Sequence, residues 1–111
     1  MKMDEAFSKM KMDKAFSMIS LATRAGKTVS GQEQVISAVR CGRARLVIIS
    51  EEASSGTRKK ISDKCAYYNV PLVILGTRKE LGKACGRQER TAAAVTDDGL
   101  ARAVTDAAKK N

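Results

Sequence analysis

Hydrophobic positions along the chain alternate between helical spacing and short continuous apolar runs. Helical spacing, with capping residues and glycine stops, predicts helices over residues 11–25, 31–41, 54–68, 77–86 and 97–108. Apolar runs such as RLVIIS predict strands at residues 28–29, 45–50, 71–75 and 91–96. This alternation predicts an α/β fold, a three-layer α/β/α sandwich on a small, mostly parallel or mixed sheet of about four strands.

The N-terminal segment carries a duplication: KMDEAFS at residues 2–8 recurs as KMDKAFS at 11–17. An offset of nine residues turns a helix by about 900°, so Phe7 and Phe16 would face opposite sides and only one copy can serve the core. We assign that role to the second copy, which carries an apolar stripe of Ala15, Phe16, Met18, Ile19, Ala22 and Ala25. We therefore expect residues 1–10 to be a disordered or appended repeat and residues 11–111 to form a single domain.

The helix expected at residues 54–68 has one apolar and one basic face. Ile61, Cys65 and Tyr68 share the apolar face, and the RKK run at 58–60 lies with Lys64 largely on the other. We interpret the basic run as a solvated helix face. Because the chain has two Phe, two Tyr and no Trp, and Tyr68 falls on the apolar face, we expect no aromatic platform for stacking successive bases.

Composition and charge narrow the function. With 43% hydrophobic residues in a length of 111, the chain can build one core without disulfides or metals. Its net charge of +9 and isoelectric point near 9.8 favour a polyanionic partner, nucleic acid before a membrane surface, although a merely solubilised surface is the plain alternative. The absence of His removes the usual general base, so we do not expect an enzyme.

Cysteine and glycine spacing offers no cofactor site. Cys41, Cys65 and Cys85 form no CxxC pair and have no His to complete a zinc site, so we expect no metal and reduced, buried thiols of a cytoplasmic protein. The GKT run at 26–28 lacks the glycine five residues earlier that a phosphate loop requires, so we expect no nucleotide cofactor. The longest apolar runs are too short to span a bilayer, and we expect no membrane contact.

A first candidate binding site lies where a strand is expected to turn into a helix, at Ser30, Gly31, Gln32, Glu33 and Gln34. Free backbone N–H groups at such a helix start can bind a phosphate, and the polar side chains of residues 32–34 would project there with Lys27 nearby. An ordinary glycine-containing helix start is the alternative.

A second candidate is the polar loop formed by Arg87, Gln88, Glu89 and Arg90. Its two guanidinium groups, its amide and its carboxylate can contact base edges or phosphates, while a solvated surface turn is the alternative. In a sheet of the proposed kind, this loop and the segment at Ser30 could lie at the same end.

Two long stretches of the chain resemble a known family. They are SLATRAGKTVSGQEQVISAVRCGRARLVIISEEAS at residues 20–54 and KCAYYNVPLVILGTRKELGKACG at 64–86. The chain is similar, over about residues 12–108, to the superfamily of small ribosomal proteins that bind kink-turn RNA, of the L7Ae type, and most closely to its bacterial YlxQ-like branch. The resemblance implies an α/β/α sandwich and non-catalytic binding of structured RNA, by the helix start after the first strand and the loop before the last.

Several residues at the matching positions differ from the family pattern. Gly31 corresponds to the family's glycine, where the backbone approaches the RNA, but Glu33 stands where kink-turn binders have Asn, Gln34 where they have Glu, and Ser37 where they often have Lys. In the family, the Asn and Glu bond to the edges of sheared guanine pairs. Gln34 can donate and accept, whereas Glu33 only accepts. The RQER loop replaces an apolar loop that packs on bulged nucleotides in the family.

We therefore expect a cytoplasmic, monomeric, ribosome-associated protein that binds kink-turn-like or internal-loop RNA, such as ribosomal RNA, with ribosomal proteins as further partners. The residues expected to contact RNA are Lys27, Ser30, Gly31, Gln32, Glu33, Gln34, Arg87, Gln88 and Arg90. The alternative, which Glu33 and the RQER loop suggest, is a protein-interaction module of a ribonucleoprotein with incidental RNA affinity.

Overall fold

The computed structural model describes the backbone of residues 3–109 and the side chains of residues 12–109. In chain order the elements are α1 (Met3–Arg24), β1 (Thr28–Ser30), α2 (Gln32–Arg40), β2 (Leu46–Ile49), α3 (Ser55–Tyr68), β3 (Leu72–Ile74), α4 (Arg78–Ala84), β4 (Ala92–Val95) and α5 (Asp98–Ala108). Each element expected from the hydrophobic pattern is present. Within the described residues, no helix is both long and apolar enough to cross a membrane.

The sheet is mixed, with strand order β1-β4-β2-β3. Strand β4 pairs antiparallel with both β1 and β2, and only the β2–β3 pair is parallel. The expectation of a mixed sheet is confirmed, whereas a mostly parallel sheet is wrong because β4 inserts between β1 and β2 in the opposite direction. Strands β2 and β4 are buried at every position, which explains their continuous apolar runs, LVII and AAAV.

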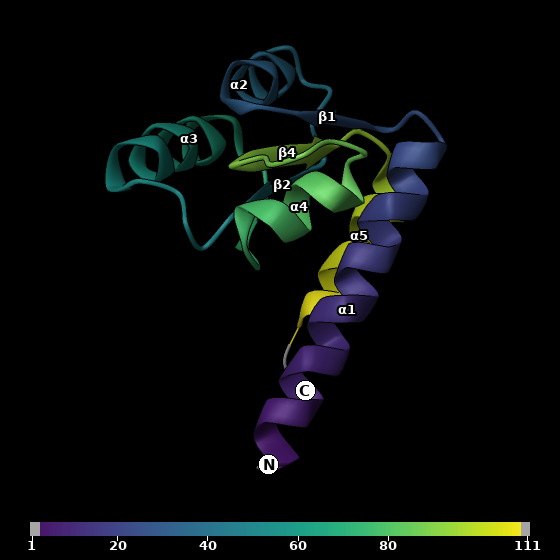
Figure 1. Cartoon of the computed structure of the whole chain (residues 1–111). Coiled ribbons are helices and arrows are strands. Elements are labelled where there is room, and N and C mark those ends of the chain that lie inside the picture. The colour runs from purple at the N-terminus through teal and green to yellow at the C-terminus, as the bar shows by residue number, and fades with distance from the viewer. Residues whose placement is uncertain (1–2, 110–111) are drawn as a thin grey trace.

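Helices cover both faces of this sheet and complete the three-layer sandwich (Figure 1). Side chains of β2 alternate between the two layers: Val47 and Ile49 pack with α2 and α3, and Leu46 and Ile48 pack with α1, α4 and α5. The alternation produces two apolar clusters, one on each side of the sheet. The cluster on the α2–α3 side includes Val35, Val39, Ile61 and Cys65, and the other includes Ile19, Leu81 and Val104.

The second copy of the N-terminal duplication contributes side chains to the hydrophobic core, as expected. Ala15, Ile19 and Ala22 are buried, with Phe16 packed against them, whereas Ala25 is exposed because it follows the last helical turn. The backbone of residues 3–10 continues the same helix, and neither copy contains a Gly or Pro that would end it. The side chains of residues 1–11 lie outside the described part, and the domain division at residue 10 stays a prediction.

One expectation about burial, that of Cys41, is wrong, and one residue assigned to an apolar helix face is partly exposed. Cys65 and Cys85 are buried as expected, but Cys41 is exposed at the C-terminal end of α2. Tyr68 lies on the same side of α3 as Ile61 and Cys65, yet 41% of its surface is exposed. Both residues occupy helix ends, and helical spacing alone does not indicate where the covering layer stops.

Candidate nucleic-acid interface

Four connections meet at one edge of the sheet. Ser30, at the end of β1, pairs with Ala93, while Ile49, at the end of β2, pairs with both Ala92 and Ile74. Strands β1, β2 and β3 therefore end where β4 begins. This topology gathers the β1–α2, β2–α3 and β3–α4 connections with the loop before β4, and loops held by a rigid sheet are common binding sites.

Helix α2 begins at this edge without a side-chain cap. Its N-cap is Gly31, with φ 99° and ψ 147°, a conformation that glycine adopts readily, and the Gly31 N–H donates to the Ala92 carbonyl over 2.9 Å. In contrast, helices α3, α4 and α5 are capped by the side chains of Ser54, Thr77 and Asp97. The first N–H groups of α2 thus have no capping side chain, and they lie at the positive end of the helix dipole.

The polar loop at residues 87–90 is held against α4. The Arg87 N–H donates to the Gly82 carbonyl over 2.7 Å, and the Arg90 N–H donates to the Arg78 carbonyl over 3.0 Å. A Cβ atom at Gly82 would lie only 2.6 Å from the Gln88 carbonyl oxygen. Only glycine at this buried position therefore allows the loop to pack so closely on the helix.

A hydrogen bond joins the two candidate segments. Arg90 Nε donates to Ser30 Oγ over 3.1 Å, so the expectation that both segments lie at the same end of the sheet is confirmed. A groove of about 530 Å³, called the β1 groove below, runs between them. Its lining is Thr23, Thr28, Val29, Ser30, Gln34, Cys85, Arg87 and Arg90. The only charged side chains in this lining are the two arginines; the others supply three hydroxyls, one amide, one thiol and one apolar side chain.

Other residues expected at the site point elsewhere. Gln32 turns toward α3, where its Oε1 accepts from Thr57 Oγ1 over 3.1 Å, and Glu33 lines a different groove between α2 and α3. Lys27 lies at the opposite end of β1, next to the backbone that follows β4. Gln88 is exposed in the loop. The structure thus brings together Ser30, Gly31, Gln34, Arg87 and Arg90, and it separates them from Lys27, Gln32 and Glu33.

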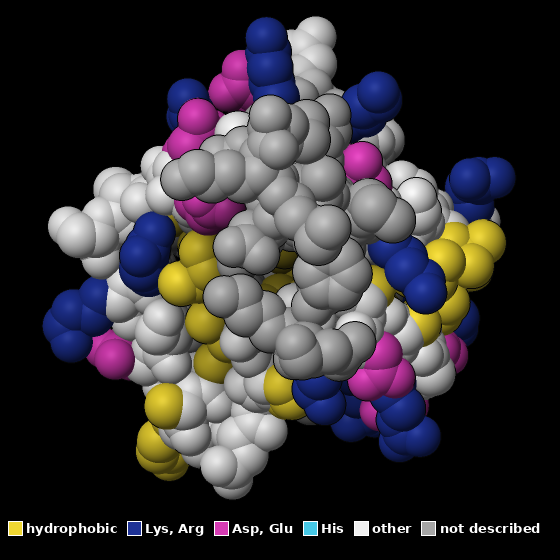
Figure 2. All heavy atoms as spheres, turned by 90° about the horizontal axis from the view of Figure 1, so that it is seen from below, with side chains coloured by type: hydrophobic (Ala, Val, Ile, Leu, Met, Phe, Trp, Pro, Cys, Tyr) yellow, Lys and Arg dark blue, Asp and Glu magenta, His cyan; other side chains and the backbone are white. Residues whose placement is uncertain are grey.

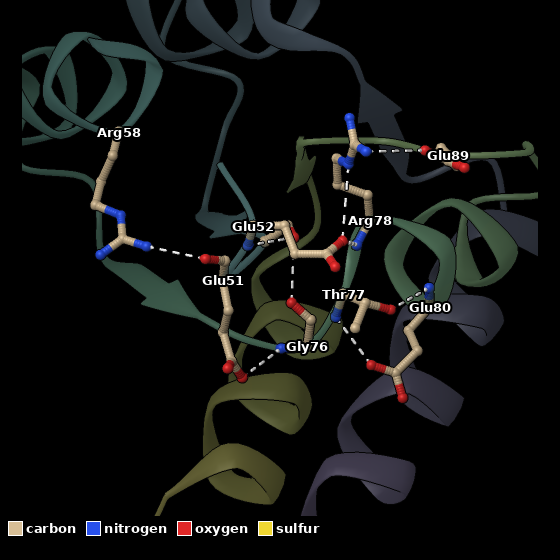
Figure 3. Close-up of polar contacts among 9 residues, drawn as sticks. Glu51, Glu52, Arg58, Gly76, Thr77, Arg78, Glu80 and Glu89 are labelled. Atoms are coloured by element: carbon tan, nitrogen blue, oxygen red, sulfur yellow. Dashed lines mark hydrogen bonds and ion pairs between the residues drawn. The ribbon is translucent and has the colours of Figure 1, made fainter. Parts of the chain in front are cut away.

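Acidic residues of the β2–α3 connection organise the same edge and were missed in the sequence (Figure 3). A Glu52 carboxylate oxygen accepts from the Arg78 N–H over 2.8 Å and lies 3.7 Å from Arg78 Nε. The Arg78 guanidinium also approaches Glu89 in the loop, with 3.5 Å between the nearest atoms. Glu51 accepts from the Gly76 N–H over 3.1 Å. No local pattern indicates these contacts, because Glu52 and Arg78 are 26 positions apart.

The start of α4 itself had a sequence signal. Thr77 and Glu80 form a capping box, in which the Thr77 hydroxyl accepts from the Glu80 N–H over 3.1 Å and the Glu80 carboxylate accepts from the Thr77 N–H over 2.9 Å. This box fixes the first turn of α4 and, with it, the position of Arg78.

Cys85 is a neutral thiol beside the two arginines. Burial raises the pKa of Cys85 to about 11, while the nearby charges of Arg90 and Arg87 act in the opposite direction. Because the thiolate is the reactive form of cysteine, a thiol that stays protonated at neutral pH is a poor nucleophile. The β1 groove therefore supplies hydrogen bonds and positive charge rather than a nucleophile.

Comparisons with known proteins agree with this architecture. The family model described as "Ribosomal protein L7Ae/L30e/S12e/Gadd45 family" matches residues 13–105. The chain is 48% identical over 86 residues to the RNA-binding protein YlxQ of Bacillus subtilis (strain 168), a match that covers 78% of this chain and 86% of YlxQ.

Two solved structures share the fold. A protein of unknown function from Bacillus halodurans C matches with a TM-score of 0.84 and 39% identity, over 87% of this chain and 98% of that one. The Giardia lamblia 15.5kD RNA binding protein matches with a TM-score of 0.75 and 22% identity, over 86% of this chain and 82% of that one. The chain belongs to the ribosomal protein L7Ae/L30e/S12e/Gadd45 family.

Proposed function

We propose that this protein binds structured RNA, without catalysing a reaction on it, through the β1 groove and the uncapped start of α2. The observation that carries the proposal is the hydrogen bond between Arg90 and Ser30, which unites the polar loop with the strand that leads into α2. Membership of a family that includes ribosomal proteins, and the similarity to a protein named as RNA-binding, support it.

The chemistry of the groove fits an RNA backbone. Arg87 and Arg90 present guanidinium groups, which suit phosphate oxygens, and the first N–H groups of α2 add donors at the positive end of a helix dipole. The carboxylate of Glu33, which would repel phosphates, lies in the lining of the other groove. Gln34 supplies an amide that can both donate to and accept from a base edge.

In this proposal the preferred RNA has a kink or an internal loop. The protein acts in the cytoplasm, as a monomer associated with the ribosome. Splayed bases in such RNA expose hydrogen-bonding edges that a regular A-form duplex hides in its narrow major groove. The amide of Gln34 in the β1 groove and the loop held against α4 suit such bases better than a continuous duplex.

A titration with labelled RNA tests the proposal. A kink-turn RNA and a plain duplex of equal length are each titrated with the full chain at several salt concentrations. We expect at least about 100-fold tighter binding of the kinked RNA, and an affinity that falls with salt by a log–log slope of roughly 0.7 to 0.9 for each phosphate neutralised.

Two results would contradict it. An affinity for RNA that does not change with salt would argue against phosphate contacts. In a pull-down with this chain, a protein partner that stays bound after thorough nuclease treatment would favour the alternative of a protein-interaction module. Equal, weak binding of both RNAs would leave RNA binding in place and remove the preference for a kink.

A further inference from the structure

A second groove lies between α2 and α3 and is predominantly basic. It has a volume of about 720 Å³ and is lined by Gln32, Glu33, Ile36, Ser37, Arg40, Cys41, Lys60, Lys64 and Tyr68. We call it the α2–α3 groove. Its lining holds three cationic side chains and one carboxylate, and within the described part of the chain none of the three cations forms an ion pair. These cations are therefore available to an anionic ligand.

Another face of the molecule has a different charge pattern. Figure 2 shows the side seen from below Figure 1, where Lys and Arg side chains stand around the rim next to Asp and Glu. Mixed charges of this kind keep a surface soluble without favouring one sign of ligand. In the α2–α3 groove, by comparison, three cations stand with a single carboxylate.

Two tyrosines stand at the end of this groove. Tyr68 belongs to its lining and is 41% exposed, and Tyr67 beside it is 79% exposed. Their rings meet edge to face, with centroids 4.8 Å apart. Exposed aromatic rings next to lysine and arginine are the combination on which single-stranded nucleic acids stack. The sequence predicts no platform for stacking several successive bases, and that prediction is untested, but these two exposed rings can stack on a single base.

The α2–α3 groove and the β1 groove meet at the first turn of α2. Gln32 and Glu33 line the former and the next residue, Gln34, lines the latter. Helices α2 and α3 lie side by side, with their starts joined by the contact between Gln32 and Thr57. From Gln32 to Arg40 helix α2 rises about 12 Å, so a short strand can pass from one groove to the far end of the other.

We propose that the α2–α3 groove binds a single-stranded segment of the RNA held in the β1 groove. Arg40, Lys60 and Lys64, which outnumber the Glu33 carboxylate at the start of the groove, contact its phosphates, and a base stacks on the Tyr67–Tyr68 pair. This inference rests on the proposed function, which supplies the structured part of the RNA. It adds a second recognition element, an unpaired strand that flanks the kink.

The test uses the tyrosines as their own reporters, because the chain contains two Tyr and no Trp. The full chain is titrated with a blunt kink-turn RNA and with the same RNA carrying about six unpaired nucleotides at its 5′ or its 3′ end. We expect one of the extended RNAs to bind about tenfold more tightly than the blunt one and to quench the tyrosine fluorescence, since stacking on one aromatic ring strengthens binding by about that factor.

Variants locate the effect. Tyr67→Ala, and Lys60→Gln combined with Lys64→Gln, should each reduce or abolish the advantage of the extended RNA and leave the affinity for blunt RNA unchanged. Tyr67 is so exposed that its removal leaves the packing of α3 intact. Tyr68→Phe should keep the affinity for the extended RNA, because the ring remains. Lys14→Gln combined with Lys109→Gln, which removes two exposed lysines outside both grooves, is the matched control for charge and should change neither affinity.

The possible failures are distinguishable. Equal affinity for blunt and extended RNA would overturn this inference and leave the proposed function standing, and so would an advantage that survives all the variants. Quenching by a free single-stranded oligonucleotide, without binding of the kinked RNA, would support the α2–α3 groove and overturn the proposed function. Binding of none of these RNAs would overturn both.

Discussion

Arg90 and Ser30 lie 60 positions apart in the chain and are joined by a hydrogen bond of 3.1 Å from the guanidinium Nε to the hydroxyl Oγ. A second bond, from Arg90 Nη1 to the Glu89 carbonyl over 2.8 Å, holds the same side chain. Because a guanidinium carries five N–H donors, others remain for an RNA phosphate. The contact with Ser30 thus orients the Arg90 guanidinium and leaves some of its N–H groups able to bind a phosphate.

Removal of both arginines from the loop should weaken RNA binding. In an Arg87→Ala, Arg90→Ala variant we expect about tenfold or greater loss of affinity and a salt slope smaller by roughly 1.4 to 1.8, as for two lost phosphate contacts. The melting temperature should fall by only a few degrees because Arg87 is exposed and Arg90 is only partly buried. Titrations at several salt concentrations and a thermal melt measure these effects.

The matched control removes the same charge from another face. Arg102→Ala with Lys109→Ala changes two exposed cations of the C-terminal part of the chain, and we expect little change in the salt slope. If both double variants lowered affinity equally, only net charge would matter and the loop would not belong to the site.

The glycine of α4 should be indispensable for the loop. In Gly82→Ala the new methyl group meets the Gln88 carbonyl at 2.6 Å, so we expect the loop to move, the chain to lose stability and RNA affinity to fall. Gly56→Ala on α3 is the control, since no atom lies within 4 Å of its added Cβ. Alanine there should stabilise the helix by up to about 1 kcal/mol without changing RNA affinity. Denaturant unfolding and RNA titration compare the two, and equal stability changes would contradict the packing argument.

Neutralising Glu52 should strengthen RNA binding. Glu52→Gln keeps an oxygen that can accept from the Arg78 N–H but removes the negative charge that pairs with its guanidinium. Since exposed ion pairs contribute about 0.2 to 1 kcal/mol, we expect affinity to rise by at most about fivefold. Asp63→Asn, which frees Lys59 on α3, is the control and should have less effect. Weaker binding by the Glu52 variant would instead mean that the charged pair positions the site.

The three thiols should differ in reactivity. At neutral pH we expect Cys41 to react quickly with a thiol reagent, because it is exposed, and Cys65 and Cys85 to react only after unfolding. Rapid labelling of two or more thiols in the folded protein would contradict this assignment.

The buried thiols also predict a pH dependence of stability. Burial raises the pKa of Cys65 and of Cys85 from 9.0 to about 11, so between these values the unfolded chain ionises first and binds fewer protons. This contribution to the free energy of unfolding is therefore complete below pH about 9 and is lost as the pH rises toward about 11. Urea unfolding across this range should show a smaller decline in a Cys65→Ala, Cys85→Ala variant than in the unaltered chain.

Sequence alone determined the helices and strands, because their signals are local. Thr77 caps the helix that it was expected to start, and Ser54 and Asp97 cap theirs where the sequence also allowed the next residue, Ser55 or Asp98. Gly26, Gly42 and Gly86 adopt positive φ where helices were expected to stop. Such choices depend on residues within one helical turn. The polar segments at 30–34 and 87–90 were visible for the same reason, as breaks in the hydrophobic pattern.

Tertiary structure alone decided which parts meet. The run AAAV predicts a buried strand but does not specify its neighbours, and only the position of β4 between β1 and β2 brings Arg90 to Ser30. Likewise, the rotation of α2 separates Gln34 from Glu33, and the limits of the packed layers expose Tyr68. Strand order and burial at helix ends follow from contacts between distant segments, and the nearest residues in the chain do not specify those contacts.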